Sequence, residues 1–270
     1  MKKVTALFIL WVLIPLSVAA APKAELWSKW QAHDAASTTV VDHGKWNDFL
    51  SRYVSTSSDG INRVAYARVS AADVEQLRIY RRALGDIAVS NLNRSEQRAY
   101  WINLYNALTL SVVLDNYPVS SIRKINISPG FFSSGPWGKK LITIEGEKVS
   151  LDDIEHRIVR PIWKDPRLHY ALNCASIGCP NLQGEAFSAN NSEALLEKAA
   201  REYINHPRGA RVEKKQLKVS SIYSWFKEDF GGTDGAVIGH LKAFAAPKLK
   251  QFLMGIDDID DDDYNWSLNE

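Results

Sequence analysis

Apolar and polar residues recur along the chain with the periods of helices and short strands. The longest helical pattern follows Asn93, where Glu96 completes a capping pair three positions later, and it predicts a helix over 94–115. Pro118 ends the pattern. Apolar residues fall on nearly all sides of this helix, which is typical of a helix buried at the centre of a fold.

Two polar residues, Asn103 and Asn106, interrupt this helix one turn apart on the same side. A buried amide without partners costs about 1–3 kcal/mol, so each should form specific hydrogen bonds. Two interpretations remain open. The amides either hold a neighbouring loop or turn in place, or line a functional site.

The remaining patterns predict a mixture of helices and short strands. Helices are expected near 21–37, 43–53, 70–87, 150–160, 193–204, 222–230 and 235–254, and strands or hairpins at 61–69, 141–149, 168–174 and 212–219. There are no internal repeats and no low-complexity linker. We therefore expect a single-domain α+β fold, with the central helix packed on a small, mainly antiparallel sheet and several helices around it.

The helix expected at 150–160 begins with Ser150 and Asp153, a typical start signal. At 100° per residue, Glu155 lies within about 40° of the centre of its apolar side, whereas His156 points away. An inward carboxylate needs a charged or hydrogen-bonded partner. We expect Glu155 to meet an arginine, a histidine or backbone donors, and His156 to be more exposed.

Both cysteines lie in one stretch, D-P-R-L-H-Y-A-L-N-C-A-S-I-G-C-P at 165–180. A strand over 168–174 would place His169 on the face opposite Cys174. Cys174 and Cys179 can join in an oxidising compartment. Such a bridge would contribute only about 2 kcal/mol by the chain-entropy formula, so folding does not require it.

The segment 125–146 contains several Gly and Pro turns together with Phe131, Phe132 and Trp137. Long irregular segments of this kind often serve as lids or binding loops. An ordered surface loop pinned by its aromatic residues is the alternative.

The N-terminus has the layout of a secretory signal peptide, with two lysines, a mostly apolar run at 4–18 and then small residues. We expect 1–20 to be the signal peptide, cleaved after Ala19 or Ala20, and 21–270 to be the domain. The apolar run is shorter than the roughly 20 residues that span a bilayer. The sequence therefore predicts a periplasmic or secreted, soluble protein.

Without Lys2 and Lys3 the chain carries 33 − 2 = 31 basic and 31 acidic residues, so its formal charge is zero. A neutral chain is a poor nucleic-acid binder, because phosphate binding needs a basic surface. The six aspartates within 257–263 are expected to form a solvated segment. Calcium is the alternative there, although the glycine and final glutamate of an EF-hand loop are missing.

Several segments together resemble the uncharacterised family known as domain of unknown function 547, DUF547. They are Y-W-I-N-L-Y-N-A-L at 100–108, V-S-L-D-D-I-E-H-R-I-V-R at 149–160, the cysteine stretch at 165–180, I-Y-S-W-F-K-E-D-F at 222–230 and N-W-S-L-N at 265–269. The resemblance covers 95–270 and implies no established activity. Asn265 stands where the family pattern has Asp before Trp, which weakens a charge-based role for the last segment.

The residue types allow a thiol-dependent hydrolase or acyl transferase, papain-like or transglutaminase-like, acting on a small molecule or peptide. Cys174 would be the nucleophile, with a histidine as base and an amide or carboxylate orienting it. A free thiol of pKa near 8.5 is only about 3% ionised at neutral pH, so Cys174 would need a lowered pKa. The candidate site residues are Cys174, His169, Glu155, Asn103 and Asn106, with His156 as an alternative base.

Three alternatives stay open beside this one. A structural Cys174–Cys179 disulfide would leave a non-enzymatic binding or interaction module. A redox role is disfavoured because the gap between the cysteines is not C-x-x-C. A zinc site would draw on His169, Cys174, Cys179 and His156. The sequence predicts no cofactor, and it does not decide whether the protein is an enzyme.

Overall fold

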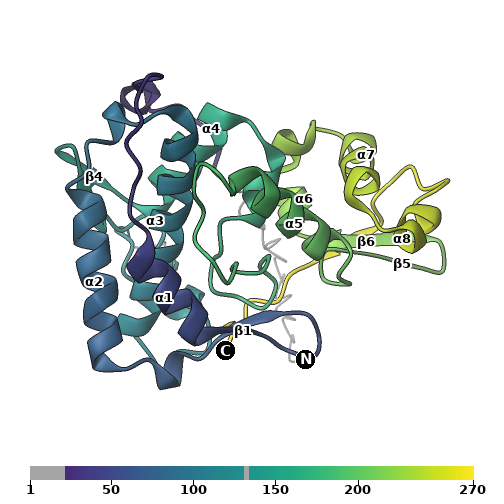
Figure 1. Cartoon of the computed structure of the whole chain (residues 1–270). Coiled ribbons are helices and arrows are strands. Elements are labelled where there is room, and N and C mark those ends of the chain that lie inside the picture. Colours follow the sequence, from purple (N-terminus) through teal and green to yellow (C-terminus); the bar gives the residue numbers. More distant parts are fainter. Residues whose placement is uncertain (1–21, 131–133) are drawn as a thin grey trace, which may run out of the picture.

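Figure 1 shows the computed structural model of the chain, which describes residues 22–130 and 134–270. The expected signal peptide at 1–20 and the loop residues Phe131 and Phe132 lie outside the described residues. Helices alternate with short strands, and the fold is α+β, as predicted. Within the described ranges, no helix is long and apolar enough to cross a membrane.

The central helix is α3, Arg94–Asp115. Its first turn is capped by Asn93, whose side-chain oxygen accepts a hydrogen bond from the Glu96 amide at 3.0 Å. Nearly every residue from 96 to 113 is buried. Both the bounds and the burial predicted from the pattern are confirmed.

The first half of the chain surrounds α3. In Figure 1, α2 runs beside α3, and α1 and two hairpins complete this half. The elements are η1 Ser28–Gln31, α1 Gly44–Tyr53, β1 Val54–Thr56, β2 Asn62–Val64, η2 Tyr66–Arg68, α2 Ala71–Gly85, η3 Val89–Asn91, η4 Ile122–Lys124, β3 Ile142–Ile144 and β4 Glu147–Val149. The strand expected over 61–69 is thus confined to three residues.

The second half builds a smaller apolar core around α5, on the side of the molecule opposite α2 in Figure 1. Its elements are α5 Ser192–Ile204, β5 Ala210–Glu213, β6 Gln216–Ser220, α6 Ile222–Trp225, η7 Lys227–Phe230, α7 Asp234–Phe244, α8 Pro247–Phe252 and β7 Asp261–Asp263. β5 and β6 pair antiparallel, and β7 joins β6 in parallel. The strands described form three separate small sheets rather than one, and each strand has only three to five residues.

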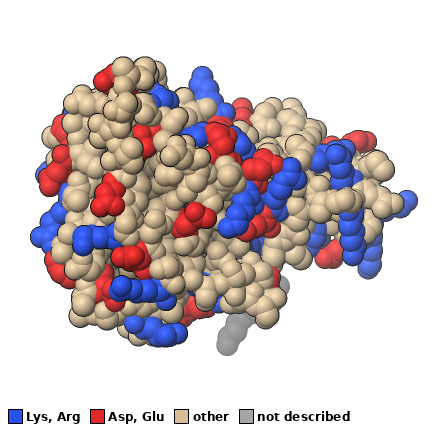
Figure 2. All heavy atoms as spheres, viewed as in Figure 1, with Lys and Arg blue, Asp and Glu red and all other residues tan. Residues whose placement is uncertain are grey.

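The acidic segment near the C-terminus is exposed, as expected, but part of it is ordered as β7. Asp261 pairs with Lys218 at 3.0 Å, and Asp263 pairs with Arg211 at 2.5 Å. These aspartates therefore bind the neighbouring strands through side chains as well as backbone. On the face drawn in Figure 2, acidic and basic side chains are interspersed.

The strand predicted at 168–174 is wrong. Pro166–Tyr170 form a 3₁₀ helix, η6, and an irregular loop follows. Asp165 caps this helix by accepting a hydrogen bond from the Arg167 amide at 2.9 Å, and Pro166 sets its first position. These signals override the alternating pattern. Because 168–174 is not a strand, His169 and Cys174 do not lie on opposite strand faces.

The helix predicted at 150–160 exists, but most of it is a π-helix, η5, Asp153–Val159, which leads into α4, Arg160–Trp163. The wider turn changes which side chains face inward. His156 is only 6% exposed, so the expectation that it would be more exposed is wrong. π-Helical turns occur frequently at functional sites.

Candidate functional site

The loop that carries both cysteines is fixed to the central helix by an amide. Asn106 on α3 donates to the Ala171 carbonyl at 2.9 Å and accepts from the Asn173 amide at 2.8 Å. Asn173 in turn donates to the Pro180 carbonyl at 2.8 Å and closes the loop. Asn106 therefore sets the position of the residue directly before Cys174.

Asn103, one turn earlier on α3, holds a different segment of backbone. Its amide donates to the Phe187 carbonyl at 2.7 Å and accepts from the Phe187 amide at 3.0 Å. These bonds hold the segment that leads into α5. Asn103 thus anchors backbone, as the first of the two interpretations had it, and the structure gives it no contact with either cysteine.

The C-terminal segment covers the other side of the cysteine loop. The Ile177 amide donates to the Ser267 carbonyl, and the Gly178 amide donates to the Asn265 carbonyl, both at 2.8 Å. A Cβ atom on Gly178 would lie 2.8 Å from the Asn265 nitrogen, closer than van der Waals contact allows. Glycine is therefore required for the two segments to meet.

Three groups contact the Cys174 sulfur, and we call them, with Cys174, the sulfur cluster. They are Tyr264 Oη at 3.0 Å, Cys179 Sγ at 3.1 Å and Ser176 Oγ at 3.2 Å. Both cysteines are free thiols in the structure. The Cys174 amide donates to Cys179 Sγ at 2.9 Å. The three side chains that hydrogen-bond to this sulfur are a tyrosine, a cysteine and a serine, none of which carries a full charge in its ordinary form.

The sulfur cluster favours the charged form of one thiol over the other. The hydrogen bond from Cys179 is the main cause that lowers the pKa of Cys174; Ser176 and Tyr264 add to it and burial opposes it. Burial raises the pKa of Cys179 well above its ordinary value, and that of Tyr264 as well. A thiolate would therefore form on Cys174, with the other two groups as proton donors.

The residue after Cys174 has an uncommon backbone conformation. Ala175 has a φ of 56°, in the left-handed region that costs an alanine about 1–2 kcal/mol. It is also fully buried. Backbone strain of this kind is concentrated at functional sites, where the surrounding structure holds it. The turn lies directly after Cys174, whose half-buried sulfur contacts Tyr264.

Glu155 on η5 is half-buried, and its partner is a tyrosine of α3 rather than the arginine, histidine or backbone donors that were expected. Tyr105 donates a hydrogen bond to Glu155 Oε2 at 3.0 Å. The negative charge of Glu155 acts to raise the pKa of Cys174, so this carboxylate is near the sulfur and opposes thiolate formation. The pKa of Asp152 is raised to about 6. Burial is the main cause, and the charges of Glu155 and Asp153 add to it.

The two histidines belong to a separate, ionic cluster, which consists of His156, Arg160, His169 and Asp229. His169 Nε2 lies 2.7 Å from Asp229 Oδ2, and Arg160 Nε lies 2.5 Å from the same oxygen. Arg160 Nη1 donates to His156 Nδ1 at 2.9 Å. Neither imidazole is within hydrogen-bond distance of Cys174, so the structure does not form the contiguous triad that the residue types suggested.

Charges in the ionic cluster stabilise one another. Burial acts to raise the pKa of Asp229, but hydrogen bonds from His169 and Arg160 lower it to about 2. Burial lowers the pKa of His156. The His169 ring stacks on Phe226, with ring centroids 4.2 Å apart. His169 is therefore held in one orientation by a carboxylate and an aromatic face.

No local pattern in the sequence indicates a role for Asp229 or Tyr264. Each lies 60 or more residues from its partner, His169 or Cys174. The only signal for Asp229 was its place in the segment I-Y-S-W-F-K-E-D-F. Tyr264 directly precedes N-W-S-L-N. Both segments carried the family resemblance without revealing which side chains meet.

Half-buried aromatic rings extend the sulfur cluster toward the surface. Tyr264 lies 4.7 Å from Trp266 and 4.8 Å from Trp225 between ring centroids. Trp137, from the long loop expected to be a lid or binding loop, lies 5.8 Å from Trp266. The described part of that loop therefore packs against the same aromatic group as the C-terminal segment.

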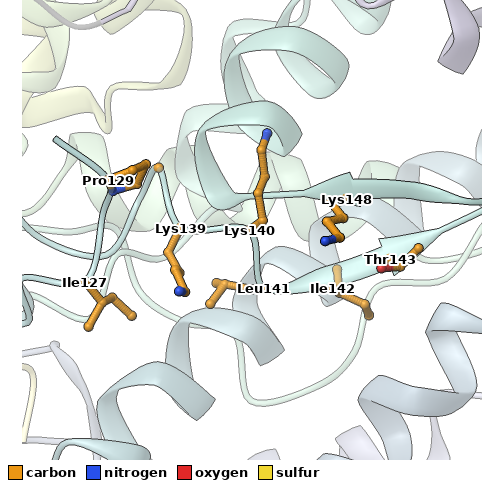
Figure 3. A pocket seen from close by; sticks show the side chains of 9 residues that line it. Ile127, Pro129, Lys139, Lys140, Leu141, Ile142, Thr143 and Lys148 are labelled. Atoms are coloured by element: carbon orange, nitrogen blue, oxygen red, sulfur yellow. The ribbon is translucent and has the colours of Figure 1, made fainter.

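Cys174 lines neither of two hollows on the described surface. One, of about 720 Å³, is lined by Tyr264 and Trp266 among others, so it opens beside the ring whose hydroxyl contacts the sulfur. The other, of about 590 Å³, is shown in Figure 3 with Lys139, Lys140 and Lys148 around it. Lys140 is paired with Asp153, which leaves two lysines facing solvent.

The geometry does not bring together a metal site. Across 22–130 and 134–270, no three His, Cys, Asp or Glu side chains lie close enough together to hold an ion. The zinc alternative needed His156 and His169 beside the cysteines, but both histidines bond within the ionic cluster.

Comparison with known proteins gives one match. Residues 89–204 match the model of a family described as protein of unknown function, DUF547. No curated protein and no solved structure matches the chain. The matched region contains α3, η5 and the cysteine loop, whereas Asp229 and Tyr264 lie beyond it.

Proposed function

The chain belongs to the DUF547 family by its residues 89–204, and we propose that it is a thiol-dependent hydrolase or acyl transferase with Cys174 as nucleophile. The observation that carries this proposal is the set of three hydrogen-bonding groups, at 3.0–3.2 Å, around one half-buried sulfur. Hydrogen bonds to a thiolate lower its pKa. A base in contact with the sulfur is then not needed to generate the nucleophile.

In the proposed reaction, the Cys174 thiolate attacks a carbonyl carbon, the C–S bond forms, and the bond to the leaving group breaks. The leaving group takes a proton from solvent as it departs. Water, or another nucleophile in a transferase, then cleaves the thioester and restores the thiolate. Tyr264 contacts the sulfur, so it can donate a hydrogen bond to the thiolate.

His169 is our candidate for proton transfer in this reaction. Its Nε2 faces Asp229, and in the neutral imidazole the other nitrogen, Nδ1, then carries the lone pair. A carboxylate that fixes the tautomer of a histidine is the usual support for a general base. His169 would take a proton from the attacking water through Nδ1, rather than from the thiol.

The test is acylation with an activated ester, p-nitrophenyl acetate, under reducing conditions. The proposal predicts a burst of one nitrophenol per protein and an acetyl group on the peptide that contains Cys174. Acetylation spread over lysines, with no burst and no modified Cys174, would overturn it. Replacement of His169 by Gln should leave the burst but slow the release of acetate.

A non-enzymatic binding or interaction module is the second candidate. The observation that favours it is the proximity of the two sulfurs, since a permanent disulfide would remove the nucleophile. Alkylation of protein purified without reductant separates the two proposals. Complete protection of Cys174 and Cys179, together with partner binding that survives Cys174→Ser, would support the module.

We also propose export to the periplasm or the medium, on the strength of the signal-peptide pattern alone. N-terminal sequencing of the mature protein tests it. A mature chain that begins at Ala20 or Ala21 is expected, and one that retains Met1 or Lys2 would contradict it.

A further inference from the structure

We infer that Cys174 and Cys179 are a dithiol that hydroperoxides oxidise to a reversible disulfide, with Cys174 as the attacking sulfur and Cys179 as the resolving one. This activity uses the nucleophile of the proposed function but requires no acyl transfer. The peroxide reaction can therefore be tested separately from the hydrolase proposal.

The positions of the two sulfurs carry the inference. They lie 3.1 Å apart. A disulfide bond is about 2.0 Å long, so the sulfurs need to approach by about 1 Å, a shift that small side-chain rotations supply. Cys174 is half-buried and can meet a small peroxide, whereas Cys179 is 3% exposed. Only one of the two sulfurs is therefore placed for the first step.

The surrounding bonds keep the sulfurs together while the reaction proceeds. Asn106 fixes the backbone just before Cys174. Tyr203 donates to the Gly178 carbonyl at 2.6 Å and fixes the backbone just before Cys179. Because both anchors are buried and neither involves a sulfur, bond formation between the cysteines leaves them intact.

The first step oxidises Cys174. Its thiolate attacks one oxygen of the hydroperoxide, an S–O bond forms and the O–O bond breaks. The leaving oxygen takes a proton from solvent and departs as an alcohol, or as water when the oxidant is hydrogen peroxide. Cys174 becomes a sulfenic acid.

The second step joins the sulfurs. Cys179 attacks the sulfenic sulfur, the S–S bond forms and the S–O bond breaks. The hydroxide that leaves takes the Cys179 proton and departs as water. An external dithiol reductant returns both thiols by disulfide exchange. In the oxidised state Cys174 has no free thiolate, so the acylation proposed above stops until the reductant acts.

The experiment follows the reduced full chain after one equivalent of hydrogen peroxide, with cumene hydroperoxide in a parallel arm. Intact mass and peptide mapping should show loss of two hydrogens and a Cys174–Cys179 link, reversed by dithiothreitol. The rate at pH 7 should exceed that of glutathione by about five- to tenfold, because a larger thiolate fraction is partly offset by lower intrinsic nucleophilicity.

Two variants separate the roles of the sulfurs. In Cys179→Ser the sulfenic acid on Cys174 should persist and be trapped by dimedone, because no resolving sulfur is present. In Cys174→Ser neither dimedone adduct nor disulfide should form. Oxidation of the wild type no faster than glutathione, or dimedone labelling of Cys179 in the Cys174→Ser variant, would overturn the inference even if acylation were observed.

Discussion

The sulfur cluster is made of uncharged hydrogen-bonding groups, whereas the ionic cluster is held together by an ion pair. Around Cys174 the contacting groups are neutral donors, namely two hydroxyls and a thiol. Around His169 the hydrogen-bonding partner is a carboxylate, which also binds a guanidinium. The difference shows that thiol activation and imidazole orientation are separate tasks in this protein. A substitution in one cluster should therefore leave the chemistry of the other largely unchanged.

The largest expected effect comes from removing the sulfur itself. Cys174→Ser should reduce ester turnover by about a thousandfold or more, because the serine hydroxyl has no base in contact to activate it. The ionic cluster should be unaffected, so the melting temperature should change little. Turnover measured with p-nitrophenyl acetate and a thermal melt check both statements. Residual turnover above a tenth of wild type would contradict the role of Cys174.

Asp229→Asn tests the other cluster. It leaves the buried Arg160 and His169 without their shared carboxylate, and we expect a loss of about 2 kcal/mol in the free energy of unfolding. The alkylation rate of Cys174 should stay within about twofold of wild type, since alkylation needs only the thiolate. Urea unfolding and iodoacetamide kinetics measure the two effects. A large drop in alkylation would show that the clusters act together.

The pH dependence of the Asp229 contribution has a definite sign. The pKa of Asp229 is lowered to about 2, so its stabilising effect is complete above the ordinary carboxyl pKa of about 4. The effect is lost as the pH falls through about 2. The stability difference between wild type and Asp229→Asn should therefore shrink below pH 4, and a constant difference down to pH 2 would contradict the ion pair.

Gly178→Ala tests the support of the sulfur cluster by the C-terminal segment. The added Cβ would lie 2.8 Å from the Asn265 nitrogen. We expect a loss of about 1–3 kcal/mol from overpacking and slower alkylation of Cys174, because the segment that carries Tyr264 must shift. Gly184→Ala is the matched control, since its Cβ would meet nothing within 4 Å and Gly184, like Gly178, does not have a positive φ. Equal alkylation rates in both variants would contradict the coupling.

Tyr264→Phe is the smallest change. It removes one hydrogen bond to the Cys174 sulfur, so the pKa of Cys174 should rise and alkylation at pH 7 should slow by about fivefold. Tyr117→Phe, which loses an exposed hydrogen bond to Glu270, is the control. The same rate in both variants would show that Tyr264 does not stabilise the thiolate.

The sequence predicted those parts of the fold that depend on local signals. The capping pair Asn93 and Glu96 and the buried pattern after it located α3, and a buried amide at Asn106 indicated a specific anchor. Local signals failed where two of them competed. Pro166 with its Asp165 cap imposed a 3₁₀ turn on an alternating pattern.

The composition of the site was harder to predict for two physical reasons. In the π-helix η5 a wider turn replaces the 3.6-residue period, so the inward position of His156 could not be read from a regular helical wheel. The partners of His169 and Cys174 come from segments 60 and 90 residues away. One sequence contains no signal for such pairings, which is why the two clusters were expected to be one.

The pH dependence of Cys174 alkylation in the reduced wild type tests the central claim most directly. The rate with iodoacetamide at that residue, followed by mass spectrometry from pH 5 to 10, reports the thiolate fraction. We predict an inflection clearly below the ordinary cysteine pKa of about 8.5. An inflection at or above that value would show that the three donors do not stabilise a thiolate, and would contradict the proposed nucleophile.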